Sequence, residues 1–195
     1  MSPAAFDPAD GLTLLVEFTS QTAPPAGEAE ICDQGLSVAV RAFKAARGAL
    51  FLENGTAGDL RRVAVKGRSA KEIPESLARA AMAAPGDLKE ARRSGETFRV
   101  AMPLPGPEGA IGALLLEGPE RWDESARQFA KSMAKALSAA LCTARKLDES
   151  RMQGELLARR NVELETLREL GARIQSKVED YEILETALQL VLEKL

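Results

Sequence analysis

Few side chains in this sequence could carry chemistry. Histidine is absent from the 195 residues, and the two cysteines are Cys32 and Cys142. These counts exclude histidine-ligated metals, histidine-assisted nucleophiles, a phospho-accepting histidine and a zinc site of four thiolates within this chain. Cys32 lies on an apolar helical stripe, so we expect a small core residue there, and we expect both thiols to be reduced.

Arginine is the remaining candidate for a binding role. Arginines occur in or beside predicted strands at 61–62, at 92–93 and at Arg99. A guanidinium can hold a carboxylate or phosphate through two parallel hydrogen bonds, whereas an arginine on a solvated strand edge has no such role. Arg99 alternates with Phe98 and Val100, so its side chain lies on the other face of its strand. If that face borders a pocket, Arg99 is the candidate anchor for an acidic ligand.

The elements that position these residues change in character near residue 120. All 10 prolines lie at or before Pro119, so the rest of the chain permits long helices. In the first part, alternating strands and turn sequences predict hairpins over 49–66 and 98–116. Helical composition over 74–82 separates them, and the polar stretch 87–95 is expected to be mainly loop.

Helices are predicted at both ends of this sheet. Two amphipathic segments precede the first hairpin, and Asp123 is the expected N-cap of a long helix that starts at Glu124. Antiparallel hairpins with helices at both ends are typical of an α+β domain. We therefore predict an α+β domain over residues 1–148, with a central antiparallel sheet flanked by helices, and a helical or coiled-coil segment over 149–195.

A heptad pattern runs along the C-terminal segment, with exceptions at Arg160, Gly171 and Glu185. An apolar a/d seam predicts that two copies of the helix pair in a coiled coil. We therefore expect a homodimer through the C-terminal helices. The residues assigned to this dimer helix are Leu157, Leu164, Leu167, Ile174 and Val178.

The same segment also resembles the start of the chain. An ungapped alignment places Leu164 on Leu12 and Leu195 on Phe43, and it keeps the apolar positions between them. This interpretation makes the end of 149–195 the first helices of a truncated second domain of the same kind. It predicts a helix break at 175–181, whereas a continuous coiled coil has none; we favour the break.

Four segments resemble the GAF domain, a sensory module of bacterial kinases, cyclases and transcription activators. They are AARGALFLENG (45–55), DLRRVAVKG (59–67), VAMPLPGPEGAIGALLLEGP (100–119) and WDESARQFAKSMAKALSAAL (122–141). The resemblance implies a sheet with the terminal helices on one face and often a small-molecule pocket on the other, roofed here by residues 67–95. It also implies helices that continue into a parallel dimer, and tandem copies joined by a long helix.

The ligand signatures of this family are missing from the sequence. The cyclic-nucleotide type carries an Asn-Lys pair, and neither Asn54 nor Asn161 is followed by lysine. The bilin and haem types require histidine. We therefore predict no cofactor, and the ligand of the expected pocket stays unassigned.

Together these observations predict a non-enzymatic sensory and dimerisation module of a bacterial signal-transduction protein. Such a protein would be a histidine kinase, a cyclase or a transcription activator, and the module would bind a small ligand or partner and relay through its C-terminal helix. The alternative is a ligand-free interaction scaffold, whose pocket is filled by its own side chains, Phe98 and Met102 among them. An enzyme like the free methionine sulfoxide reductases, which use this fold, needs closely placed cysteines, and Cys32 and Cys142 do not supply them.

Charge and hydropathy restrict the partners. The 26 basic and 29 acidic residues give a net charge of −3, and neither half of the chain is basic enough to neutralise a phosphate backbone. No secretory signal and no bilayer-length apolar segment occur. We therefore predict a cytoplasmic protein that binds neither nucleic acid nor membrane.

Overall fold

The computed structural model of the chain describes residues 6–22, 26–54, 59–67, 73–84, 88–92, 98–118 and 122–192. Within these ranges, the side chains of 90–92, 178–179 and 190–191 lie outside the description. Internal contacts divide the chain into two compact units, Met1–Lys146 and Leu147–Leu195.

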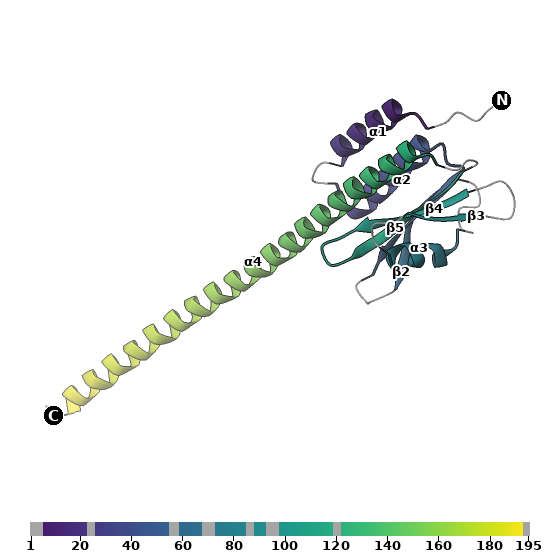
Figure 1. Ribbon diagram of the computed structural model, residues 1–195. Helices are drawn as coiled ribbons and strands as arrows, with labels where there is room; N and C mark the ends of the chain where they lie inside the picture. Colours follow the sequence, from purple (N-terminus) through teal and green to yellow (C-terminus); the bar gives the residue numbers. More distant parts are fainter. Residues whose placement is uncertain are drawn as a thin grey trace. The chain divides into compact units, whose positions relative to one another are not determined.

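The first unit is built on an antiparallel sheet, which in the described residues has five strands in the order β2-β1-β5-β4-β3 (Figure 1). The two predicted hairpins, β1–β2 and β4–β5, are confirmed. β5 lies in the centre of the sheet because its apolar run needs cover on both faces. The strands are β1 (Arg47–Glu53), β2 (Leu60–Gly67), β3 (Lys89–Arg92), β4 (Phe98–Pro105) and β5 (Ala110–Gly118).

The expectation of a loop over 87–95 is wrong for β3. Residues Lys89–Arg92 pair with β4, from Lys89 opposite Ala101 to Arg92 opposite Phe98. The sequence KEAR has no apolar alternation, so its own pattern does not predict a strand. The backbone groups along the edge of β4 provide the pairing that holds this short strand.

Three helices lie over one face of the sheet: α1 (Pro8–Gln21), α2 (Glu28–Ala42) and the first part of α4 (Glu124–Leu192) (Figure 1). The predicted cap of α4 is confirmed, because Asp123 Oδ1 accepts a hydrogen bond of 2.7 Å from the Ala126 backbone N–H. Cys32 has 0% exposure on α2, which confirms it as a core residue. Alternate residues of the central strands supply the sheet side of this core, including Leu50, Val100, Met102, Leu114 and Leu116.

The short helix α3 (Glu75–Met82) covers the opposite face (Figure 1). Its Ala78 and Ala81 are fully buried, in one cluster with Phe51 and Leu115 of the central strands. Small side chains on both surfaces let a helix approach the sheet closely. The remaining sheet residues of this second core are Ala49, Leu60, Ala101 and Ala113.

One part of the scaffold alternative is wrong. It expected Phe98 and Met102 to fill the pocket on the side away from the terminal helices. Met102 instead belongs to the core beneath those helices, and strand alternation places Phe98 on the same face. The side chains that fill the α3 face are those around Phe51 and Leu115.

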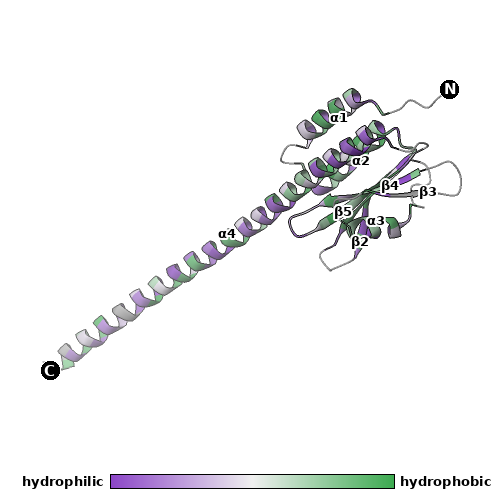
Figure 2. Ribbon diagram, viewed as in Figure 1, coloured by the Kyte–Doolittle hydropathy of each residue, from purple (hydrophilic) through white to green (hydrophobic). Residues whose placement is uncertain are grey.

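The second unit consists of the remainder of α4. The expected break at 175–181 is wrong, because α4 is helical without interruption through this stretch to Leu192. No proline follows Pro119, and Ser176 and Asp180 are tolerated inside a helix whose other residues are mainly good helix formers. Hydrophobic and hydrophilic residues alternate along this segment (Figure 2).

Candidate functional site

Three charged side chains form a row across the central strands on the α3 face. The register places Arg47 of β1 and Arg99 of β4 on either side of Glu117 of β5. Nη2 of Arg47 lies 2.9 Å from Oε1 of Glu117, and Nε of Arg99 lies 2.7 Å from Oε2. One carboxylate therefore bridges two guanidinium groups. Alternation along the strands puts this row on the same face as Ala49, Leu115 and Ala101, which contact the α3 core.

The charged row is largely buried, so each of its side chains depends on the charges of the other two. The side chains of Arg47 and Glu117 are 8% and 5% exposed. Burial by itself raises the pKa of Glu117, but the hydrogen bonds from Arg47 and Arg99 and their positive charges outweigh it, so the pKa lies below its usual value of 4.5. Glu117 is therefore ionised at neutral pH and holds both arginines in place.

Arg99 is the member of the row that solvent reaches, with a side chain 17% exposed. Within the described part of the chain, its partner is Glu117, which accepts from Nε. The edge formed by Nη1 and Nη2 therefore points two parallel donors away from that ion pair. This is the guanidinium edge that matches a carboxylate or a phosphate.

Two of the other arginines singled out by the sequence, Arg61 and Arg62, do not join Arg99. Arg61 lies 3.4 Å from Glu28 of α2, on the helical side. Arg62 places its guanidinium 5.2 Å from the centre of the Phe51 ring. Arg93 and the side chain of Arg92 lie outside the described residues. Among the described residues, Arg99 instead belongs to a row of two arginines and one glutamate.

Sequence reasoning missed Arg47 and Glu117. Each lies at the end of an apolar strand, where a charged side chain is normally expected to be exposed to solvent. The strand register would identify them. It places the buried residues Ala49 and Ala101 on either side of Leu115. Two residues further along the strands, the same register places Arg47 and Arg99 on either side of Glu117. Register follows from the hairpin turns and the burial of both faces.

The cysteines are not brought into one site. Cys32 is buried, and that burial raises the pKa of its thiol to about 12. Cys142 lies on α4 and is partly exposed. Among the described residues, no group of three or more cysteine, aspartate or glutamate side chains could hold a metal ion.

The residues assigned to the dimer helix are exposed. Leu157, Leu164, Leu167 and Ile174 are 62%, 51%, 63% and 64% exposed. The side chain of Val178 lies outside the described residues. The same helix segment also exposes Leu170 and Leu184, each directly before one of the polar or glycine exceptions in the heptad pattern.

Comparison with known proteins identifies the fold. No family model matches the chain, and no curated protein does. Solved structures do match, among them the GAF domain of a phosphoenolpyruvate-protein phosphotransferase from Acinetobacter, at 13% identity and a TM-score of 0.58, covering 69% of this chain and 94% of that one. A GAF domain assigned to a sensor histidine kinase of Pseudomonas syringae pv. tomato has 21% identity and a TM-score of 0.55, covering 77% and 94%.

An enzyme has the same architecture. The free methionine-R-sulfoxide reductase of Neisseria meningitidis, solved with its substrate, has 18% identity and a TM-score of 0.60 over 74% of this chain and 96% of that one. These similarities show that the chain has the GAF fold. Among the described residues, none of the helices combines the length and the apolarity that a bilayer span requires.

Proposed function

We propose that this chain is a non-enzymatic sensory and dimerisation module of a signal-transduction protein, located in the cytoplasm. In this proposal the GAF-fold unit receives a small acidic ligand or a partner, and the C-terminal part of α4 carries the dimer contact and the output. The observation that carries the proposal is the exposed apolar seam of the C-terminal segment. Two of the GAF-fold structures described above come from signalling or phosphotransfer proteins, which agrees with this role.

The seam gives a second helix a surface to bury. Leu164, Leu167 and Ile174 are each at least half exposed on one helix. Burying one such side chain contributes roughly 1.5–3 kcal/mol. The exceptions Gly171 and Glu185 follow Leu170 and Leu184, so the apolar stripe continues past them. Because the apolar residues follow a heptad spacing, a coiled-coil helix is the partner structure that buries them best.

Charges beside the seam favour a parallel, in-register pair. With Leu157 and Leu164 at a positions, Glu163 occupies g, and Arg168 occupies the following e position. Lys177 and Glu182 have the same relationship with the signs reversed. In a parallel dimer, each g residue lies beside the following e residue of the other helix, so both pairs attract. The partner helix that fits this surface therefore comes from a second copy of the same chain.

The ligand part of the proposal rests on Arg99. Arg99 is the most exposed member of the charged row, at 17%, and its contact with Glu117 through Nε leaves Nη1 and Nη2 as the proposed donors to the ligand. Such a group selects a carboxylate or phosphate. A catalytic role through thiols is disfavoured, because Cys32 is buried with a raised pKa.

The ligand-free scaffold is the alternative, and a specific observation favours it. The middle of the α3 face is filled by protein, since Phe51 and Leu115 are 1% and 2% exposed and Ala78 and Ala81 are fully buried. In this alternative, Arg47, Glu117 and Arg99 are purely structural, and the seam is the only functional surface. Native mass spectrometry of the purified protein separates the two, since a retained small acid that is lost in Arg99→Gln supports the sensor.

The dimer is tested by sedimentation equilibrium of the full chain. We expect the wild type to be a dimer and Leu164→Glu to be a monomer at the same concentration. Val162→Glu is the matched control, because Val162 is 63% exposed on the same helix but lies off the seam. A monomeric wild type would overturn the proposal. Equal dissociation of both variants would show that the seam is not the interface.

A further inference from the structure

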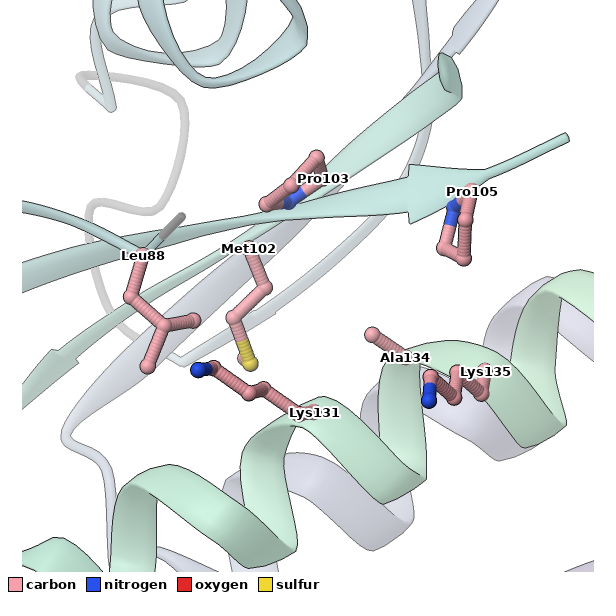
Figure 3. A pocket seen from close by; sticks show the side chains of 7 residues that line it. All are labelled: Leu88, Met102, Pro103, Pro105, Lys131, Ala134 and Lys135. Atoms are coloured by element: carbon pink, nitrogen blue, oxygen red, sulfur yellow. The ribbon is translucent and has the colours of Figure 1, made fainter. Parts of the chain in front are cut away.

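We propose that a second binding site lies on the helical side of the first unit, between α4 and the edge of β4, and that it takes a small organic acid with an apolar body. The site is a cavity of about 240 Å³, lined by Leu88, Met102, Pro103, Pro105, Lys131, Ala134 and Lys135 (Figure 3). Met102 belongs to the core under the terminal helices. The cavity is therefore distinct from the charged row around Arg99.

The wall on the sheet side is apolar and does not accept a strand. In the described residues, the pairing of β3 with β4 stops at Ala101, so the next part of β4 forms the edge of the sheet. Pro103 and Pro105 lie in this part and have no backbone N–H, and the carbonyl oxygen of Pro105 accepts a hydrogen bond from the Ser138 hydroxyl. An added peptide strand thus finds little to pair with, whereas an apolar group can contact Leu88 and the two proline rings.

The helix side of the opening is cationic. Lys131 and Lys135 stand one turn apart on α4, and the side chain of Lys131 extends toward Met102 and Leu88 (Figure 3). Within the described residues, neither lysine takes part in an ion pair. From residue 125 to residue 147 the sequence has basic but no acidic side chains. Along this part of α4, therefore, no carboxylate competes with an anion from outside for the two lysines.

Size sets the class of ligand. A cavity of about 240 Å³ lies below the roughly 300–1,000 Å³ that is usual for ligand pockets, so it suits a small occupant, for example an acid of about ten non-hydrogen atoms. Apolar walls with charged groups at the opening fit a carboxylate at the lysines and a short hydrocarbon or aromatic body against Leu88 and the proline rings, above the buried Met102. This inference does not depend on the dimer, because all seven lining residues belong to the first unit.

Octanoate is the probe for the test, and the methionine methyl signals of the full chain in NMR are the readout. We expect saturable shifts at Met102 and none at Met152, which is 71% exposed on the C-terminal segment. Octan-1-ol should bind at least about tenfold more weakly, because it lacks the charge-assisted contact. Shifts at Met152 of equal size would show unspecific adsorption and overturn the proposal.

Substitutions of the lysines make the test specific. Lys131→Gln/Lys135→Gln should weaken octanoate at least about tenfold, while Lys146→Gln, on the same helix but outside the cavity, should leave it unchanged. Lys131→Glu/Lys135→Glu should reverse the preference toward octylamine. Unchanged octanoate affinity in the glutamine variant would overturn the proposal. So would a Met102 signal that moves with protein concentration alone, because a second copy would then cover the cavity.

Discussion

Arg99 and Glu117 face each other across the β4–β5 pair, with Arg99 Nε 2.7 Å from Glu117 Oε2. The other carboxylate oxygen of Glu117 lies 2.9 Å from Arg47. A single buried anion therefore binds both arginines, of which Arg99 is the more exposed, at 17% against 8% for Arg47. The candidate ligand anchor and the stability of the sheet centre depend on the same residue.

Glu117→Gln should destabilise the domain strongly. Glutamine has nearly the same shape as glutamate but removes the negative charge between the Arg47 and Arg99 guanidinium groups, which costs about 3 kcal/mol in unfolding free energy. Urea denaturation at neutral pH measures this. Glu75→Gln is the control, because the Glu75–Arg79 pair is exposed on α3 and its loss should cost about 0.5 kcal/mol or less. Equal losses in the two variants would contradict the central role of Glu117.

The unfolding free energy of the protein should decrease at low pH because of Glu117. Its pKa in the folded state lies below the usual 4.5, so the unfolded chain takes up a proton more readily than the folded one. The stabilisation is complete above that value and is lost as the pH falls through the lowered pKa. Unfolding free energies measured from neutral pH down to about pH 3 should fall less steeply in Glu117→Gln than in the wild type. Parallel profiles would show that Glu117 is not the titrating group.

The two thiols should react at different rates. Cys32 has 0% exposure and a thiol pKa raised to about 12, whereas Cys142 is partly exposed. A thiol reagent at mildly alkaline pH should therefore label one thiol quickly in the native protein and both in denaturant. Cys142→Ser should abolish the fast phase. Persistence of the fast phase in that variant would mean that Cys32 becomes accessible in the native state.

Gly112 on β5 should not tolerate a side chain. A methyl group there would overlap with the backbone oxygen of Phe51 on the neighbouring strand, so Gly112→Ala should lower the unfolding free energy by at least about 2 kcal/mol. Thermal and urea unfolding measure the loss. Gly154→Ala on α4 is the contrast, because nothing lies within 4 Å of the added atom and alanine favours a helix. It should not destabilise the protein.

A charge exchange tests the direction of the proposed coil. Glu163→Arg should weaken the dimer, because it sets two arginines side by side in a parallel pair; adding Arg168→Glu should restore it. The dimer dissociation constant from sedimentation measures both changes. In an antiparallel dimer these residues are not neighbours across the interface, so the second substitution would give no rescue.

Local sequence determined most of the elements. Alternation with turn residues identifies the two hairpins, and Asp123 marks the start of α4 because an N-cap needs only its own side chain and the next few N–H groups. The apolar seam of 149–195 is equally local, since its spacing is visible without any partner. The sequence also established that histidine chemistry is absent from this chain.

Tertiary structure decided what depends on pairing between distant residues. β3 is a strand because the edge of β4 pairs with it, while its own residues carry no strand pattern. The row of Arg47, Glu117 and Arg99 exists because residues from three strands meet at one register, and the cavity beside Lys131 exists because α4 packs over the edge of β4. α4 runs through 175–181 because the helix propensity of the residues there outweighs the local signal for a break. A local pattern depends on residues that are close in sequence, whereas these sites are formed by residues that are distant in sequence and close together in the folded domain.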